Sequence, residues 1–336
     1  MLKKYIALLA VIIILTSSPV SYVLTIAADQ IYLLSHSQKI ESVLKDPQVD
    51  SAIKTQLALV PEIMQFGNNL GFPETKAYAR YIPLQRNVFL HSLSATKQDS
   101  FEEYTWWWPF IGTLPYKGFI NKTSAQREEA ELKAKGYDTY LGKSSAMSTL
   151  GFFSDPILAT MINTTDATVL MNTIYHERTH QLFFTNDIVF NENAAVLLGA
   201  LAALEFTQQQ FGNESAEHVL QQEKISDLLL FSQFIDNCYT ELDTFYHTSA
   251  PSEKTEKRKN IFNQCKDNFN DIPLKRSFKS FGETELNNAF ILAQYRYYGK
   301  IHEYYQVYEK IGDIRKTIEF FNQASQAENP DSVILS

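Results

Sequence analysis

Apolar residues recur every three or four positions along much of this chain, which is the period of an amphipathic helix. Residues 51–70 show the pattern most clearly, with Ile53, Leu57 and Ile63 in one stripe and Gly71 just beyond it. The same period predicts helices over residues 27–44, 123–135, 166–184, 191–206, 216–245, 260–268 and 284–298. Strand-like composition is confined to residues 77–94, 137–141 and 144–151. The pattern predicts an α+β fold that is mainly α-helical and has a small sheet.

The first 26 residues follow a different pattern. Lys3 and Lys4 precede an unbroken apolar run over residues 5–15, and no further charge occurs before Asp29. This arrangement is typical of a signal peptide, but residues 5–26 are also long enough to span a bilayer as an N-terminal membrane anchor. A buried N-terminal helix is the remaining alternative. In the first two cases the lysines stay cytoplasmic and the rest of the chain crosses the membrane. We therefore expect a location in the cell envelope, either membrane-anchored or periplasmic and secreted.

Composition narrows the class of protein that residues 27–336 can form. The chain has 336 residues, of which 45% are hydrophobic, so a sizeable core is possible, and we expect a single domain. The net charge is −8 and there is no run of Lys or Arg, so no nucleic-acid partner is expected. No glycine-rich phosphate loop or dinucleotide fingerprint is present. Cys238 and Cys265 are too few for a cysteine zinc cluster, and their spacing does not decide whether they pair.

Candidate chemistry is concentrated in the predicted helix over residues 166–184, which contains His-Glu-x-x-His at residues 176–180. Residues four apart share one face of a helix, so His176 and His180 can reach one metal ion. Glu177 lies about 100° further round the helix, beside such an ion, where it suits a general base for a bound water. The alternative is a chance match, in which two unrelated histidines lie on an ordinary helix.

Glu192 lies twelve residues after His180, at the start of the next predicted helix. A short turn at residues 185–187 allows the chain to double back, so two antiparallel helices would bring Glu192 opposite the histidines. Two His and one Glu form one of the ligand sets of catalytic zinc, with the fourth position left open for water. We therefore expect a zincin-like pair of helices that holds Zn²⁺ through His176, His180 and Glu192.

Three other stretches have open interpretations. Residues 106–108 are three consecutive tryptophans, which either line a groove for an apolar or peptidic ligand or belong to the core. The extended segment 144–151 precedes the metal helix, where it is either an ordinary sheet edge or a strand that pairs with a substrate backbone. Tyrosines at residues 295–298 are candidate donors to an oxyanion, and we expect Tyr295 and Tyr298 to act in this way.

The order and spacing of several motifs resemble one bacterial family, that of the predicted aminopeptidases. The motifs lie at residues 114–119 (Leu-Pro-Tyr-Lys-Gly-Phe), 135–138, 148–156, 176–180, 190–192 and 287–289, and the likeness extends from about residue 27 through most of the chain. The resemblance implies a gluzincin-type zinc peptidase with His176, His180 and Glu192 as ligands and Glu177 as the base. It also implies an envelope location.

The chain departs from that family and from related peptidases at three points. Tyr22 stands where a lipoprotein needs a cysteine, which favours an anchor or a cleaved signal over lipidation. Ala195 and Val196 occupy the region where many gluzincins carry a carboxylate that orients a ligating histidine. No Gly-x-Met-Glu-Asn segment, an amine-binding element of one large aminopeptidase group, is present.

The sequence thus predicts a zinc metallopeptidase, with peptides as substrates and the membrane as a partner through the N-terminal segment. An aminopeptidase is the leading form, and an endopeptidase is the nearest alternative. A different class also fits the sequence, namely a membrane-tethered binding or assembly protein whose metal site is not catalytic.

Overall fold

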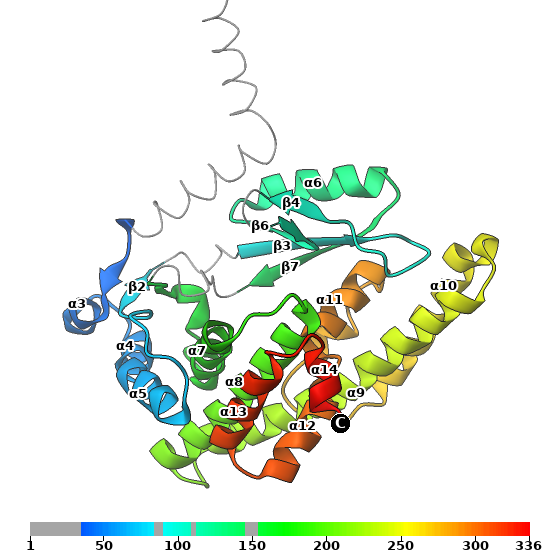
Figure 1. Cartoon of the computed structure of the whole chain (residues 1–336). Helices are drawn as coiled ribbons and strands as arrows, with labels where there is room; N and C mark the ends of the chain where they lie inside the picture. The colour runs from blue at the N-terminus through cyan, green and yellow to red at the C-terminus, as the bar shows by residue number, and fades with distance from the viewer. Residues whose placement is uncertain (1–34, 84–89, 109–111, 145–153) are drawn as a thin grey trace, which may run out of the picture.

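A computed structural model describes residues 35–83, 90–108, 112–144 and 154–336 (Figure 1). The fold is mainly α-helical with small sheets, which confirms the predicted α+β class. The largest sheet and one helix lie at one end of the molecule, above a larger helical body. The predicted signal peptide or anchor, residues 1–26, falls outside the described residues. Residues 145–151 of the predicted extended segment also fall outside them.

The helical body is built around one long apolar helix, α8. Around α8 lie α5, α7, α9, α11, α12 and α13, all in contact with it. The bounds of the helices in the body are α3 (Ile40–Lys45), α4 (Ser51–Ala58), α5 (Val60–Leu70), α7 (Thr168–Leu182), α8 (Ile188–Phe211), α9 (Ala216–Thr248), α10 (Pro251–Asn270), α11 (Asn288–Tyr298), α12 (Ile301–Ile311), α13 (Ile314–Ala324) and α14 (Pro330–Ile334). Two short 3₁₀ turns occupy Ala159–Met161 and Lys279–Phe281.

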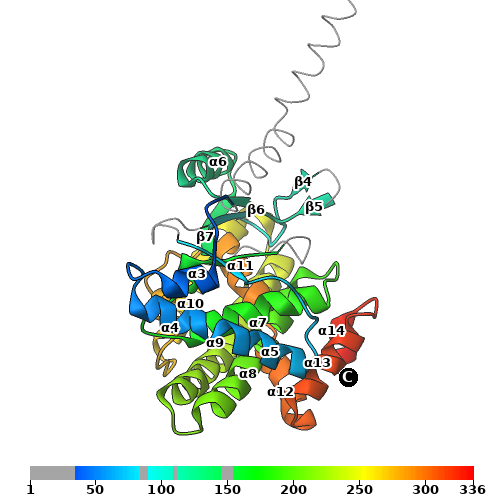
Figure 2. The same ribbon diagram turned by 90° about the vertical axis from the view of Figure 1, so that its left-hand side faces the viewer.

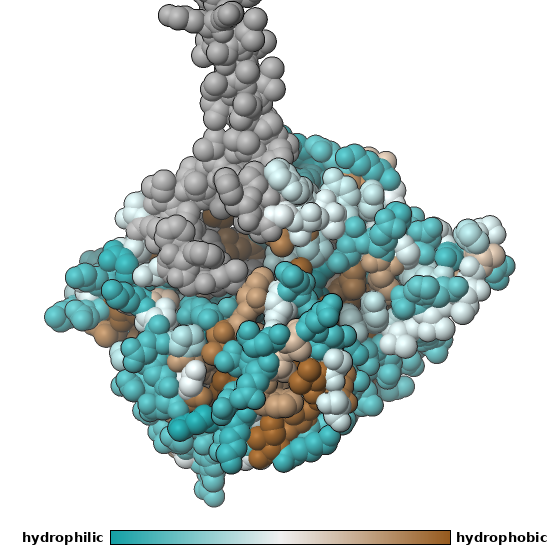
Figure 3. Space-filling view, viewed as in Figure 1, coloured by the Kyte–Doolittle hydropathy of each residue, from teal (hydrophilic) through white to brown (hydrophobic). Residues whose placement is uncertain are grey.

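Between Ala194 and Leu204, helix α8 is apolar on all sides because its neighbours enclose most of this stretch. Leu197, Leu198 and Ala202 are fully buried in it, as is usual for the central helix of a helical domain. It is the one helix among the described residues that is long and apolar enough to cross a membrane, and 72% of its apolar stretch is buried inside the protein. Polar residues cover most of the face shown in Figure 3, and apolar residues show mainly between the helices.

The main sheet is antiparallel and has the strand order β6–β3–β7. Its strands are β3 (Leu90–Thr96), β6 (Tyr116–Phe119) and β7 (Asp138–Ser144), with Ser92 opposite both Gly118 and Gly142. Helix α6 (Lys122–Ala134) covers one face of this sheet and α11 packs against the other (Figure 1). The sheet therefore meets the helical body through α11.

Two smaller sheets complete the fold. One joins β1 (Gln38–Lys39), β2 (Arg80–Ile82) and β8 (Ile157–Leu158) in that order. The other is the hairpin of β4 (Trp106–Trp108) and β5 (Gly112–Leu114), which stands beside α6 above the helical body (Figure 2). Trp106 is buried there and its Nε1 donates to Glu128 Oε1 at 2.7 Å, whereas Trp107 is 61% exposed. Of the two interpretations of the tryptophans, a place in the core is therefore the correct one for Trp106.

Two predicted helices differ from the structure. Of the predicted helix over residues 27–44, residues 27–34 lie outside the described residues. Helix α3 begins only at Ile40, because residues 38–39 pair with β2 as a strand. The predicted helix over 51–70 is two helices that meet at Leu59, one residue before α5 begins. Pro61 lies in the first turn of α5, where its missing N–H leaves no helical acceptor unpaired. An apolar stripe that continues across such a junction does not reveal it.

Candidate metal centre

The candidate site is built on the hairpin of α7 and α8, whose turn is fixed by polar side chains. Asp187 caps α8 by accepting from the Phe190 amide at 2.9 Å. Asn191 holds the other side of the turn: its Oδ1 accepts from the Thr185 amide at 2.9 Å and its Nδ2 donates to the Thr185 carbonyl at 2.8 Å. Because Glu192 follows Asn191 directly, this turn sets where Glu192 lies relative to α7.

A glycine lets the two helices approach closely along the hairpin. A Cβ atom placed on Gly199 would lie 3.0 Å from the His176 amide nitrogen and 3.1 Å from the Asn172 carbonyl oxygen. Gly199 is seven residues, or about two helical turns, beyond Glu192, so both lie on the side of α8 that faces α7. The backbone of α7 therefore packs directly against α8 at the level of His176.

The opposite side of α7 is anchored to α5. Arg178 is fully buried, and its guanidinium donates to the Met64 carbonyl at 2.8 Å, to Asn68 Oδ1 at 2.6 Å and to the Pro73 carbonyl at 2.9 Å. The Tyr175 hydroxyl donates to the Ile63 carbonyl at 3.0 Å. These contacts restrict rotation of α7 about its axis, which decides the directions of His176 and His180.

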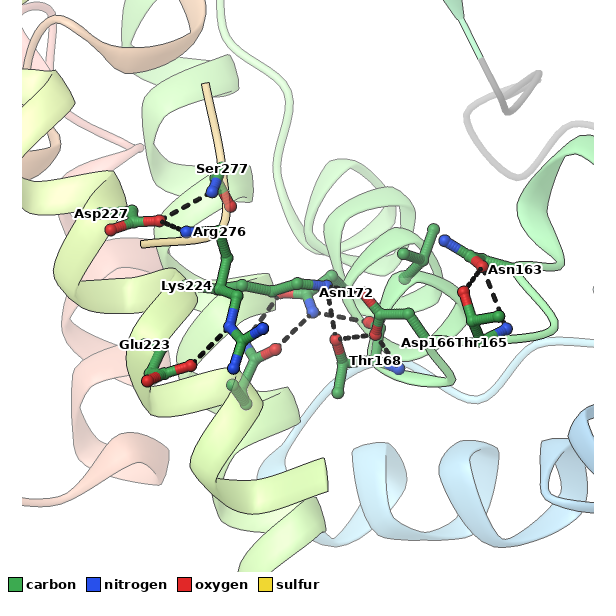
Figure 4. Close-up of polar contacts among 12 residues, drawn as sticks. Asn163, Thr165, Asp166, Thr168, Asn172, Glu223, Lys224, Asp227, Arg276 and Ser277 are labelled. Atoms are coloured by element: carbon green, nitrogen blue, oxygen red, sulfur yellow. Dashed lines mark hydrogen bonds and ion pairs between the residues drawn. The ribbon is translucent and has the colours of Figure 1, made fainter. Parts of the chain in front are cut away.

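The beginning of α7 is tied to α9 by a polar network (Figure 4). Lys224 of α9 contacts Asp166 Oδ2, just before α7, and donates to Thr168 Oγ1 at 2.7 Å. One turn further along, Asn172 and Gln221 exchange two hydrogen bonds through their amide groups, of 2.8 and 3.0 Å. Helix α7 is thus held by three neighbours, α5, α8 and α9.

The structure brings His176, His180 and Glu192 together. The two Nε2 atoms of the histidines are 3.2 Å apart, and Glu192 Oε2 lies 3.4 Å from His176 Nε2 and 3.5 Å from His180 Nε2. Three donor atoms that converge in this way can hold a metal ion. The sequence prediction of a hairpin that places Glu192 opposite the histidines agrees with this arrangement.

Burial leaves several polar atoms here without partners. Glu192 Oε2, His180 Nδ1 and Glu177 Oε2 are buried and have no well-directed hydrogen bond among the described residues. Burial raises the pKa of Glu192, but the contacts with His176 and His180 outweigh it and hold that pKa at about 2. Burial likewise lowers the pKa of His176, but the nearby Glu192 and Glu177 outweigh it and the pKa is raised. The site therefore favours a positive charge between these side chains.

A cavity of about 590 Å³ adjoins His176 and Glu177. One face of α7 forms its floor, and strands β3, β6 and β7 contribute Ser94, Tyr116 and Lys143. Helices α8, α9 and α11 and residues 277–278 form the remaining walls. The cavity lies between the sheet and the helical body, as a cleft for an extended ligand would.

The tyrosines of α11 divide between this cavity and the core. Tyr298 lines the cavity and packs edge-on against Phe278, and burial raises its pKa to about 12. Tyr295 is not among the lining residues and instead stacks on Tyr239 with ring centres 3.9 Å apart. The prediction of Tyr295 as an oxyanion donor therefore has no geometric basis, because its ring faces α9.

Two tyrosines that the sequence analysis did not select as donors interact electrostatically with both Glu192 and Glu177. Tyr297 and Tyr116 both line the cavity. Burial, with Glu192 next, raises the pKa of both hydroxyls, and Glu177 adds to this. Both hydroxyls thus keep their protons and can donate hydrogen bonds. Tyr116 belongs to the motif at residues 114–119, which marks it as a candidate but does not indicate its function. The sequence alone does not distinguish Tyr297 from the neighbouring Tyr295 and Tyr298.

Comparison with known proteins identifies a family for this chain. The family model described as "Putative aminopeptidase" matches residues 21–332. Neither the curated proteins nor the solved structures give a significant match. The match spans the candidate metal centre, the sheet and nearly all of the helical body, and the chain therefore belongs to the putative aminopeptidase family.

Proposed function

We propose that this protein is a zinc-dependent peptidase whose zinc ligands are His176, His180 and Glu192. The separations of the three donor atoms carry the proposal. Ligand atoms about 2.0–2.1 Å from a tetrahedral zinc lie about 3.3 Å from one another, and the three separations here are 3.2, 3.4 and 3.5 Å. A cation among these atoms would also give Glu192 Oε2, which has no hydrogen-bond partner among the described residues, a ligand bond.

The number of ligands favours a catalytic site. In the described part of the chain no fourth His, Cys, Asp or Glu joins this group. A structural zinc is usually held by four protein ligands, whereas a catalytic zinc keeps one position open. This observation supports a peptidase over a binding or assembly protein with a non-catalytic metal site.

Glu177 is suited to move the proton. A zinc ion bound at this centre would polarise the substrate carbonyl and lower the pKa of a bound water to about 7. Glu177 follows the first ligand and lines the cavity, and its buried Oε2 has no partner among the described residues. Its carboxylate accepts the proton of the attacking water and passes it to the leaving amine.

Tyr297 and Tyr116 are suited to stabilise the charge that develops on the carbonyl oxygen. An oxyanion needs hydrogen-bond donors that are already in place. Both hydroxyls remain protonated at neutral pH, because burial and the nearby carboxylates raise their pKa values. We assign the donor role to Tyr297 and Tyr116, with Tyr298 further along the same wall.

The family description, "Putative aminopeptidase", supports a peptidase, and we propose that the cleaved bond lies at the amino end of the substrate. Comparing hydrolysis of free peptides with that of their N-acetylated forms tests this preference. An aminopeptidase loses activity on the acetylated peptides, whereas an endopeptidase cleaves both at similar rates.

A disulfide supports the proposed envelope location. Cys238 of α9 and Cys265 of α10 are joined, with Cα atoms 5.9 Å apart, and both are buried. Such bonds persist in oxidising compartments outside the cytoplasm. This agrees with an N-terminal segment that directs the chain across, or anchors it in, the membrane.

The test of the proposal is Glu177→Gln. We expect the variant to keep one zinc per chain, because Glu177 is not a ligand, and to lose about 10²–10⁴-fold in the rate of peptide hydrolysis. Zinc content by elemental analysis and hydrolysis of a peptide library measure the two effects, with a chelator-treated sample as control. An unchanged rate would refute the role of Glu177. Zinc without cleavage by the wild-type protein would favour the binding or assembly protein.

A further inference from the structure

The cavity follows one face of α7 for two helical turns. Its floor includes Val169, Asn172, Thr173, His176 and Glu177, at the three- and four-residue spacings of a single helix face. The cavity therefore extends from the proposed metal centre toward the N-terminal end of α7. A peptide cleaved at the metal centre has room to continue in that direction.

At the far end the cavity wall is mostly apolar, with one cation. Val169, Ile225, Leu228 and Phe278 contribute apolar surface, and Lys224 contributes an ammonium group whose side chain is 21% exposed. A charge held against apolar surface is partly desolvated, so its interaction with an anion is stronger than in open water.

The contacts of Lys224 leave it able to bind one more group. An ammonium has three N–H donors, and among the described residues Lys224 contacts Asp166 Oδ2 and Thr168 Oγ1 (Figure 4). Asp166 does not line the cavity, and its other oxygen accepts from the amide and the hydroxyl of Thr168, at 3.0 and 2.6 Å. Asp166 thus holds Lys224 in place from behind, and the cavity side of the ammonium remains for a ligand.

Other polar groups at this end are already paired. Asn172 and Gln221 bond to each other, and Gln221 also donates to the Ala200 carbonyl at 2.9 Å. The neighbouring Arg276 pairs with Glu223 at 2.6 Å and does not line the cavity. Two other cations line the cavity, Lys143 from β7 and Arg296 from α11, and Arg296 pairs with Glu103. Lys224 is the cation that α9 contributes, next to Ile225 and Leu228.

We propose that Lys224 is a carboxylate-binding subsite for the peptide substrate, an inference that rests on the proposed peptidase function. Thr168, which contacts Lys224, precedes His176 by eight residues, or about 12 Å along the helix axis. An extended peptide covers about 3.3 Å per residue. The carboxylate recognised by Lys224 therefore lies three or four residues from the cleaved bond.

Matched probes separate the two possible sources of that carboxylate. The probes are peptides of three to six residues that contain only alanine and phenylalanine, so their side chains are uncharged. Each is prepared with a free C-terminal carboxylate and as a C-terminal amide. A third set consists of amides with one glutamate three or four residues from the cleaved bond. We expect about tenfold higher kcat/KM, with cleavage sites assigned by mass spectrometry, for the form that presents the carboxylate to Lys224. A preference for the free acid identifies the C-terminus, and a preference for the glutamate identifies a side chain.

Three variants test whether Lys224 is responsible. Lys224→Met should remove the preference. Lys224→Arg keeps the positive charge and should retain the preference, and it controls for a general folding defect at this position. Arg276→Met removes a nearby cation that does not line the cavity and should leave the preference unchanged. Thermal unfolding of each variant verifies the fold.

Binding to the zinc-loaded Glu177→Gln protein separates this inference from the proposed function. Calorimetry should show about tenfold tighter binding of the carboxylate probes than of their neutral amides, whether or not the wild-type protein cleaves them. Absence of cleavage together with this difference would sink the peptidase function and leave the subsite standing. Equal binding of the charged and neutral probes, or a preference that survives in Lys224→Met, would overturn the subsite.

Discussion

Glu177 and Glu192 are both carboxylates beside the histidine pair, and their surroundings separate their roles. Glu192 lies within 3.5 Å of both histidines, which keeps its pKa at about 2 and its charge negative. Glu177 lines the cavity and leaves a buried oxygen unpaired among the described residues. A permanent anion suits a metal ligand, whereas an uncommitted carboxylate at the cavity suits proton transfer.

The tyrosine assignments predict a contrast among three variants. Tyr297→Phe and Tyr116→Phe should each lower kcat, because each removes a hydrogen bond to the oxyanion of the transition state. The loss should be about 10²-fold for the main donor. Tyr295→Phe should remain within about twofold of wild type, because its ring stacks on Tyr239 outside the cavity. Steady-state kinetics on one peptide give kcat and KM for all three. The assignment fails if Tyr295→Phe is the slowest variant.

At this scale the sequence predicted which side chains the fold brings together in the candidate metal centre. The His-Glu-x-x-His spacing defines one helix face by itself, and Glu192 required only a tight turn. The choice among Tyr295, Tyr297 and Tyr298 was not predictable in the same way. It depends on which face of α11 meets the sheet, and contacts between distant elements decide that face.

At the scale of elements, the distance between α7 and α8 controls the site. The backbones meet at Gly199, and the turn at residues 185–187 fixes the other end of the hairpin. Because the histidines and Glu192 lie on different helices, a small change in this distance changes their separations directly.

Gly199→Ala tests this control. Alanine favours the helix by about 1 kcal/mol over glycine, but its Cβ would press on the backbone of His176 and Asn172, and overpacking costs about 1–3 kcal/mol. We expect a net loss of stability of about 1 kcal/mol and zinc binding weakened by about tenfold, as for disturbed support around a metal.

Competition with a chelator measures zinc affinity in this variant, and thermal unfolding of the metal-free protein measures stability. Gln208→Ala, on the exposed part of the same helix, is the matched control and should change neither. Unchanged zinc affinity in Gly199→Ala would show that the approach of the helices does not set the ligand positions.

Element boundaries were predictable where a local signal ends a helix and were missed where a distant partner intervenes. Gly71 ends α5 in the left-handed conformation, with φ of 102°, as its position after the apolar stripe indicates. Residues 38–39 leave the predicted helix because β2, some forty residues away, pairs with them. The proposed substrate strand at 144–151 stays a prediction, since residues 145–151 lie outside the described part.

At the scale of the whole molecule, the main sheet lies between α6 and α11 (Figure 1). It also forms one side of the cavity. The mainly helical α+β class followed from the apolar periodicity. The order of the layers, with the sheet between α6 and α11, did not follow from it. Helix α11 has one face toward the core and one toward the cavity, and its sequence alone does not distinguish the two.

The disulfide predicts a stability difference that depends on redox conditions. It closes a loop with a sequence separation of 27 residues between α9 and α10. Restricting the unfolded chain in this way contributes about 3–4 kcal/mol. We expect Cys238→Ala with Cys265→Ala to lower the free energy of unfolding by that amount in oxidising buffer. Reducing agent should have the same effect on wild type and none on the variant, as followed by denaturant unfolding. Equal stability of the oxidised wild type and the variant would contradict this.

The most direct test of the central claim is a zinc titration of peptide hydrolysis by the metal-free protein. Zinc is removed with a chelator and returned in fractions of an equivalent, and the hydrolysis rate is measured at each step. We predict no hydrolysis without metal and a linear rise that ends at one zinc per chain bound at His176, His180 and Glu192, the three side chains that we propose hold the catalytic ion. Hydrolysis that persists without metal, or zinc that binds without restoring hydrolysis, would contradict the proposed zinc peptidase.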